Sequence, residues 1–452
     1  MVEVGLRKQL LMDDYAVEDV WKLRRTVHQP RRHPAGPVLV KDRPWEGLGP
    51  MMEGSVLRDE ERGVVRLWYE IFDAEGYRKR VGAYQACYAE SRDGIHWEKP
   101  ELGQFEWQRS TANNILRIGS NRTQGFAVQR FDHVADPGRR YWMVYCDSAK
   151  PYGSGLCLAF SPDGLRWTPY DGNPIAQGHS DTTHSLVWDG ARGIYTVFMR
   201  PPVYAGPWKR RIARITSEDG LTWSEPETVL TPDELDTPEM YGMPVSLHDS
   251  MYLGRLEIFS GDQETIYLEL AWSRDGRHWH RHPERPAWLP LGEPGAFDSH
   301  MVFASPAPIR VGDELWQYYG GWNGPHSEFG RDSAIGIGTL RLDGFVSQDA
   351  GEEEGVLLTR PFVLEGSGIE VNAAAQAGGF VAGELWGPSA ARAEGDAFPG
   401  FSRAECDTFG GDSAARRLTW RGSPDVSSLR GRVVRLRLHL KQASLYAFQV
   451  VQ

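Results

Sequence analysis

The sequence predicts an all-β protein, a five-bladed β-propeller followed by a β-sandwich domain. Three observations support this fold class. The 452 residues include 50 Gly, 29 Pro and 17 each of Trp, Tyr and Phe, a mixture typical of short strands joined by tight turns. A seven-residue motif recurs four times, each time after an alternating apolar stretch. After about residue 348 this repeat stops and the composition changes.

The repeated motif is Ser-x-Asp-Gly-x-x-Trp. Asp-Gly favours a tight turn, because Gly accepts positive φ and Asp bonds back to the turn backbone. We interpret the motif as a structural staple between the two outer strands of a four-stranded sheet, so its aspartates are not assigned to catalysis. The copies begin at Ser91, Ser161, Ser217 and Ser273, and a degraded fifth copy covers residues 341–345.

Each motif defines one blade. Alternating apolar stretches before the motifs predict the third strands, and similar stretches further upstream predict the second strands. Five units of four antiparallel strands, each of about 56–70 residues, indicate a propeller over residues 1–348, with residues 1–50 packing on or closing the ring. The third strands are 86–89, 156–159, 212–215, 267–270 and 335–338; the second strands are 66–69, 141–145, 195–198, 252–255 and 315–319; the first strands begin near Glu53, Gly125, Asp181, Glu239 and Asp298.

Residues 349–452 have a different pattern. Alternating stretches with Gly-rich turns predict a separate β-sandwich there. Asp407, Asp412 and Asp425 are candidates for a calcium or sugar site, although ordinary loop acids explain them better. We expect no cofactor, and leave only a structural calcium ion open.

Charge and composition exclude several function classes. The net charge of -11 argues against a nucleic-acid partner, which would require basic patches.

No signal peptide or membrane-spanning segment is visible, so we expect a cytoplasmic protein without a membrane partner, although a trimmed leader would give the same sequence. The four cysteines have irregular spacing and are interpreted as buried free thiols, not as a disulfide framework or a zinc site. Homo-oligomer formation is left open.

Carboxylates mark the starts of the predicted first strands. In a propeller these strands line the central channel, so their starting ends surround one shared funnel. Four of the five blades bring an acid there: Glu53, Asp181, Glu239 and Asp298. Converging carboxylates suit glycoside hydrolysis, in which one acid protonates the leaving oxygen and a second carboxylate activates water or attacks the sugar. Capping and inter-blade bonding are the alternative roles for these acids.

Other polar and aromatic side chains are expected near the same funnel. Arg122, Arg200 and Arg255 follow strand starts or second strands. His184 and His300 lie close to an acid and either bind a sugar hydroxyl or a metal, or satisfy a neighbour. Aromatic and histidine side chains in Gly/Pro-rich loops can stack on sugar rings, although a Trp can equally wedge blades together. These are Trp45, Trp208, Trp322 and His326.

On these motifs, residues 40–345 resemble the five-bladed propeller glycoside hydrolases, the broad group of β-fructosidase, arabinanase and mannoside-phosphorylase-like proteins. The tail resembles the β-sandwich often appended to such propellers. Carried over by position, the resemblance implies that Glu53, Asp181 and Glu239 are catalytic. The sequence departs from the group's pattern because Glu53 stands where an Asp is usual, and because blade two has no acid at its start.

We therefore expect an enzyme, a glycoside hydrolase that cleaves a glycosidic bond of a small oligosaccharide or terminal sugar. Glu239 is favoured as general acid, Glu53 or Asp181 as base or nucleophile, and Asp298 as a substrate-positioning residue. A phosphorylase or transferase on the same scaffold would use Arg122, Arg200 or Arg255 to hold phosphate. A non-catalytic carbohydrate-binding propeller is the third reading.

Overall fold

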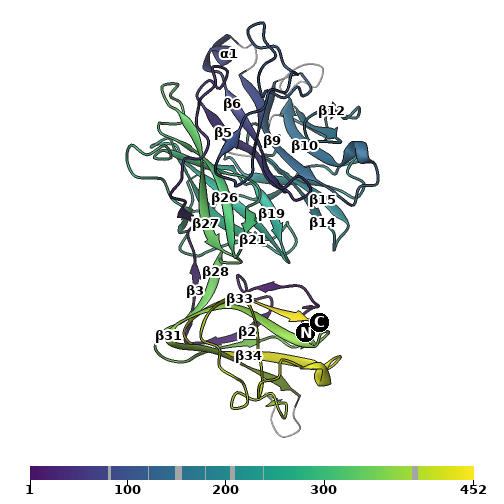
Figure 1. Cartoon of the computed structure of the whole chain (residues 1–452), viewed down its shortest axis with the longest axis vertical. Helices are drawn as coiled ribbons and strands as arrows, with labels where there is room; N and C mark the ends of the chain where they lie inside the picture. The colour runs from purple at the N-terminus through teal and green to yellow at the C-terminus, as the bar shows by residue number, and fades with distance from the viewer. Residues whose placement is uncertain are drawn as a thin grey trace.

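The computed structural model describes residues 1–79, 83–120, 122–147, 155–178, 180–203, 209–237, 239–388 and 395–452. Within these ranges nearly all regular structure is strand, and the helical elements are α1 (Ala74–Lys79) and two 3-10 turns, η1 (Pro137–Arg139) and η2 (Ser427–Leu429). The all-β prediction is confirmed. Figure 1 shows the propeller above a second β region.

The first three blades are antiparallel sheets whose strands follow one another in sequence. Their second and third strands contain the predicted segments. The strands are β5 (Pro50–Asp59), β6 (Val64–Phe72), β7 (Tyr84–Ser91) and β8 (Trp97–Glu98) in blade one; β9 (Thr123–Arg130), β10 (Tyr141–Asp147), β11 (Gly155–Ser161), β12 (Thr168–Pro169) and β13 (Ala176–Gln177) in blade two; and β14 (Ser185–Asp189), β15 (Ile194–Met199), β16 (Ile212–Ser217) and β17 (Glu227–Leu230) in blade three.

Blades four and five are joined where β21 and β24 meet at one parallel pairing, Ile266 with Met301. Blade five takes its outer strand from the N-terminal segment, because β4 pairs with β27. The strands are β18 (Met240–Gly242), β19 (Val245–His248), β20 (Met251–Ser260), β21 (Thr265–Ser273), β22 (Trp279–Arg281) and β23 (Ala287–Leu289) in blade four; and β24 (Met301–Ala304), β25 (Ile309–Val311), β26 (Glu314–Trp322), β27 (Ser333–Arg341) and β4 (Arg31–Arg32) in blade five.

Hydrophobic clusters lie between neighbouring blades. One cluster combines Leu67 of blade one with Tyr318 of blade five. Another combines Trp68 of blade one with Tyr145 of blade two. The remaining neighbouring pairs of blades share further clusters. The apolar faces predicted from the alternating strands are therefore buried between blades, and this packing positions the first strands around a common centre.

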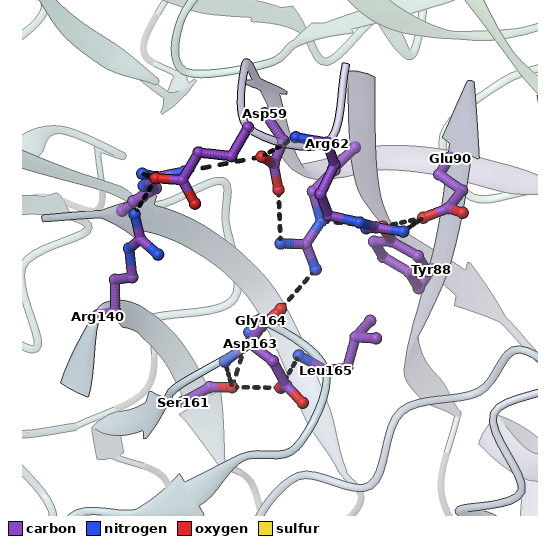
Figure 2. Close-up of polar contacts among 12 residues, drawn as sticks. Asp59, Arg62, Tyr88, Glu90, Arg140, Ser161, Asp163, Gly164 and Leu165 are labelled. Carbon is purple, nitrogen blue, oxygen red and sulfur yellow. Dashed lines mark hydrogen bonds and ion pairs between the residues drawn. The ribbon is translucent and has the colours of Figure 1, made fainter. Parts of the chain in front are cut away.

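The repeated turn motif ties each blade to the previous one. In blade two, Gly164 N donates to Ser161 Oγ (2.8 Å), and the N–H of Leu165 donates to Asp163 Oδ1 (2.8 Å). Figure 2 shows the Asp163 carboxylate turned toward its own turn. Trp68 of blade one donates through Nε1 to Gly164 O (2.7 Å). These contacts support the structural interpretation of the motif.

The second β region is one 10-stranded sheet that surrounds a core of its own. Its two long strands, β31 and β34, pair along most of their length, with irregular register between Ala375 and Phe380. Its strands are β1 (Gln9–Leu10), β2 (Val17–Trp21), β3 (Leu23–Val27), β28 (Val346–Ala350), β29 (Gly355–Thr359), β30 (Phe362–Val363), β31 (Gly368–Gly387), β32 (Asp396–Ala397), β33 (Gly411–Arg417) and β34 (Val433–Val451).

The N-terminal segment is divided between the two β regions. The sequence predicts that residues 1–50 pack on the ring or close it, and β4 does pair with β27 of blade five, but β1, β2 and β3 pair with β34, β29 and β28 of the second region. Their apolar residues, such as Leu11 and Val17, are buried in that region's core, which explains the difference. The expected domain boundary at 348/349 falls inside β28, so the division into domains stays a prediction.

Candidate active site

A cavity of about 310 Å³ opens at the end of the propeller where the first strands begin. Its size is within the roughly 300–1,000 Å³ typical of small-molecule sites. All five blades contribute to its lining, represented by Glu53, Gln124, Asp181, Tyr241 and Trp322. The turn motifs lie at the opposite ends of the strands, since each follows the end of a third strand. The shared funnel predicted from the sequence is thus a real cavity.

Glu53 owes its position to an irregularity in β5. Met51 pairs with Glu70 and Ser55 pairs with Trp68, so the register shifts between them and Glu53 lies in a bulge. Gly54 permits this close approach, because a Cβ there would lie 2.1 Å from the carbonyl oxygen of Trp68. Bulges commonly redirect a side chain beside a site. Here the bulge places Glu53 in the cavity lining.

The environment of Glu53 favours its protonated form. The residue is only 6% exposed. Burial, and second the negative charge of Asp181, raise the pKa of Glu53 to about 7, against the opposing effects of Arg200 and Arg331. A carboxyl group with this pKa can hold a proton near neutral pH and still release it, as a general acid must.

Asp181 lies in the segment before β14 and remains partly open to the cavity. Its carboxylate forms an ion pair with Arg200, which follows β15. Arg200 also donates through Nη2 to the carbonyl oxygen of Tyr241 (2.7 Å). Arg200 is buried, and both terminal nitrogens of its guanidinium have partners, so it fixes the position of Asp181.

Glu239 is one residue before β18 and does not line the cavity. Its Oε2 accepts a hydrogen bond from Arg210 Nη1 (2.7 Å), and it is Arg210 that reaches the lining. This geometry opposes the prediction that Glu239 is the general acid.

Two further glutamates lie beneath Glu53 in the channel. Glu70 Oε2 accepts from Gly125 N (2.7 Å), and Glu257 Oε1 accepts from Thr183 Oγ1 (3.0 Å). Each has one carboxyl oxygen without a partner among the described residues. Burial, and then the charge of Glu53, raise the pKa of both groups well above its usual range. Burial therefore disfavours the charged form of both carboxyl groups.

His326, Tyr241 and Trp322 form another side of the cavity. His326 Nε2 and the Tyr241 hydroxyl are hydrogen bonded (3.0 Å). Burial and the neighbouring cations Arg331 and Arg210 lower the pKa of His326 to about 4, so its imidazole is neutral at neutral pH. Burial raises the pKa of Tyr241. These rings offer neutral hydrogen-bonding groups and a flat surface suited to a sugar.

The cavity mouth carries more aromatic rings. Phe72 and Phe329 stack with centroids 6.0 Å apart. Tyr77 of α1 is 51% exposed and lies 5.8 Å from Phe329. An exposed aromatic rim of this kind can contact the apolar face of a second sugar ring.

Several predicted site residues do not reach the cavity lining. Asp298 is buried and accepts from Arg32 Nε (2.7 Å) and the Tyr319 hydroxyl (2.9 Å), so it secures β4 to blade five. His184 is buried, with Nε2 hydrogen bonded to Ser180 Oγ (2.9 Å) and Nδ1 to the carbonyl of Gly125. The side chain of His300 is hydrogen bonded to Ser299 Oγ (3.0 Å). For these residues the packing alternative fits better than substrate binding.

Three more predicted residues, Arg122, Arg255 and Trp45, also lie outside the cavity lining. Arg122 is exposed and outside the lining. Arg255 is buried, donates through Nη1 to Ser246 Oγ (2.6 Å), and has its pKa lowered to about 9 by burial. Trp45 donates to Asn114 Oδ1 (2.8 Å) beside the core between blades one and five. Trp208 lies outside the described residues.

Sequence reasoning missed Glu70, Glu257, Arg210, Arg331 and Tyr84. Glu70 and Glu257 occupy buried strands, where an acid interrupts an otherwise apolar run. That interruption was the available signal, because a buried acid requires a reason. Arg210, Arg331 and Tyr84 lie in or beside loops between second and third strands, and these loops carry no repeated pattern.

No protein family and no curated protein matches the sequence. Solved structures are similar at low identity. A β-1,2-mannobiose phosphorylase from Listeria innocua is 14% identical, with a TM-score of 0.49, over 72% of this chain and 97% of its own. A mannoside phosphorylase family structure, from work on glycoside hydrolases that target β-1,2-mannosidic linkages in Candida mannan, is 15% identical, with a TM-score of 0.46, over 74% and 97%. An N-acetylgalactosamine deacetylase from F. plautii is 16% identical, with a TM-score of 0.40, over 76% and 96%. At these sequence identities and TM-scores, the similarity does not indicate the activity of this chain.

Three other expectations concern groups away from the cavity. All four cysteines are buried and free, which confirms their prediction as thiols. Among the described residues, the one acidic and histidine cluster with spacing suited to a metal is His248, Asp249 and Asp343, and it does not include the three acids proposed for calcium. In the part of the chain that the structure describes, no helix has the length and apolar character to cross a membrane.

Proposed function

We propose that this chain is a glycoside-cleaving enzyme in which Glu53 is the general acid and Asp181 is the second carboxylate of the reaction. The observation that carries the proposal is the pairing of two unlike carboxyl groups in one cavity. Glu53 has its pKa raised to about 7, whereas Asp181 is in an ion pair with Arg200. Environments that separate the protonation of two carboxyl groups define an acid and its counterpart.

The reaction then divides between the two residues. Protonated Glu53 would give its proton to the oxygen of the departing sugar as the glycosidic bond breaks. Asp181 would attack the anomeric carbon or deprotonate a water that attacks it. The partly exposed side chain of Asp181 is compatible with either role. Trp322, Tyr241 and His326 would bind the sugar next to these groups.

Glu70 and Glu257 would support Glu53 without touching substrate. Burial disfavours the charged form of both groups, which limits their repulsion of Glu53 when Glu53 ionises after its proton is transferred. Each is held by one hydrogen bond to the channel wall, from Gly125 N and Thr183 Oγ1. We therefore treat them as positioning residues.

A second candidate is phosphorolysis on the same scaffold. It is favoured by Arg331, which lines the cavity beside Arg210 and, unlike Arg210, forms no ion pair with the described residues. The residues first considered for phosphate do not form such a site, because Arg122 and Arg255 lie outside the lining and Arg200 is paired with Asp181. A phosphorylase would transfer the sugar to inorganic phosphate in place of water.

The test is product analysis with a panel of α- and β-linked aryl glycosides and disaccharides, with and without inorganic phosphate. We expect cleavage to free sugar without phosphate, and a loss of about 100-fold or more in kcat/KM in Glu53→Gln. Formation of sugar 1-phosphate only when phosphate is present would identify the second candidate. The control is Glu60→Gln, at the far end of the same hairpin, where the side chain is 77% exposed. Sugar binding without turnover by the wild-type chain would identify a non-catalytic carbohydrate-binding propeller and reject the proposal.

A further inference from the structure

Three guanidinium groups surround the ring of Tyr241 in the cavity. Those of Arg200 and Arg210 lie 5.0 and 5.1 Å from the ring centroid. Arg331 is near enough to interact electrostatically with the same tyrosine. The first two are neutralised, because Arg200 is paired with Asp181 and Arg210 with Glu239. Arg331 has no carboxylate partner among the described residues.

Arg331 is nevertheless held firmly in place. Its Nη1 donates to the carbonyl oxygens of Pro325 and His326. Its guanidinium lies 4.6 Å from the ring centroid of Trp322, which is itself buried. Its Nε is buried and has no partner among the described residues. The side chain is thus held in one orientation, while some N–H donors of its guanidinium form no hydrogen bond with the described residues.

A guanidinium that is held in place without an anionic partner destabilises the folded protein. Arginine keeps its charge in proteins, and partial burial of that charge removes water that would otherwise stabilise it. In Arg331 burial lowers the pKa, and the charges of Glu264 and Glu328 oppose this effect only in part, since no carboxylate among the described residues is in ion-pair contact with the guanidinium. Because Arg200 and Arg210 each form an ion pair, Arg331 is the guanidinium of this group that no direct ion pair balances among the described residues.

We propose that the cavity binds a carboxylate-bearing sugar, a uronic-acid-like ring, and that Arg331 binds its carboxylate. That the ligand is a sugar rests on the proposed function. A planar guanidinium matches the geometry and the single charge of one carboxylate. A phosphate group, with a charge of about -1.5 to -2 at neutral pH, would be balanced only in part by one unpaired cation. The neutral His326 and Tyr241 then remain as hydrogen-bonding groups for sugar hydroxyls.

Binding of matched monosaccharides to the full chain tests this proposal without turnover. Calorimetry would compare glucuronic, galacturonic and mannuronic acids with glucose, galactose and mannose, alongside inorganic phosphate. We expect at least one acid to bind about tenfold or more tightly than its neutral counterpart, the usual size of a charge-assisted hydrogen bond. Arg331→Gln should abolish this preference, and Arg331→Lys should retain part of it.

The control is Arg166→Gln, whose side chain is 83% exposed on the turn motif of blade two, and it should keep the full preference. Thermal unfolding of each variant checks that it is folded. Equal binding of acids and neutral sugars would overturn the proposal, as would a preference that survives Arg331→Gln. Arg331-dependent binding of phosphate without any preference for sugar acids would also overturn it, and would support phosphorolysis. Preference for an acid with no glycoside cleaved would contradict the proposed function alone.

Discussion

At the scale of single residues, the cavity contains carboxyl groups of the same chemical type in different states. Asp181 and Glu239 form ion pairs with arginines, whereas Glu53 forms none with the described residues and is shielded from water. Glu70 and Glu257 are buried further and have pKa values well above the usual range. The surroundings of each acid, and not its residue type, therefore determine its role.

The pKa of Glu53 leads to a prediction about pH. If Glu53 must be protonated, kcat/KM falls as the pH rises above about 7. Asp181→Asn removes a negative neighbour and frees Arg200, and both changes favour ionised Glu53. In the residual activity of Asp181→Asn, the fall of kcat/KM at high pH should therefore begin at a lower pH. A profile of kcat/KM against pH measures this shift. Asp262→Asn, an exposed turn residue, is the control, and an unshifted profile in Asp181→Asn would contradict the assignment.

At the scale of elements, the bulge in β5 is what separates Glu53 from an ordinary strand residue. A regular strand would alternate between two faces, but the register shift between Met51 and Ser55 changes the direction of the intervening side chains. Gly54 allows the bulge to approach β6 closely.

Gly54→Ala tests the bulge. The added Cβ would meet the backbone of Trp68, which cannot move away as a flexible side chain can. We expect a loss of about 1–3 kcal/mol in stability, the usual cost of overpacking, and a lower kcat/KM because Glu53 is displaced. Circular dichroism during thermal unfolding measures the first effect. Gly351→Ala, where nothing lies within 4 Å, should change neither quantity.

The elements were predictable from sequence because their causes are local. Alternating apolar residues and Asp-Gly turns depend on neighbouring residues only, so the second and third strands fall inside the observed ones. The site was less predictable because it joins distant loops. Arg210 and Arg331 belong to different blades, and no spacing in the sequence brings them together around Tyr241. His184 shows the opposite error, since its position near an acid suggested binding but its ring is buried in packing.

At the scale of the whole molecule, Asp343 connects the propeller with the second β region. It accepts hydrogen bonds from Lys8 Nζ (2.8 Å), His248 Nε2 (2.8 Å) and Asn372 Nδ2 (2.9 Å). These partners come from the N-terminal segment, blade four and β31. Asp343 belongs to the degraded fifth turn motif, which has thus acquired a connecting role.

This connection predicts a pH-dependent stability. Despite opposing burial, His248 and Lys8 lower the pKa of Asp343 to about 2, from an ordinary value of 3.8. A lowered folded-state pKa gives stability that is present above about pH 4 and is lost as the pH falls toward 2. Asp343→Asn should lose about 2 kcal/mol at pH 7 and show less loss between pH 4 and 2. Thermal unfolding at these pH values measures this, and Asp262→Asn should behave like the wild type.

The pairing of β1, β2 and β3 with strands near the end of the chain also constrains the order of folding during synthesis. Residues 9–27 leave the ribosome first, but their partners in β28, β29 and β34 are made last. Blades one to four are each made from continuous chain and can assemble as they emerge. The outer strand of blade five also cannot pair early, because β4 pairs with β27, which is synthesised much later. The newborn N-terminal segment, including the exposed Trp21, must therefore remain unpaired until nearly the whole chain has been translated.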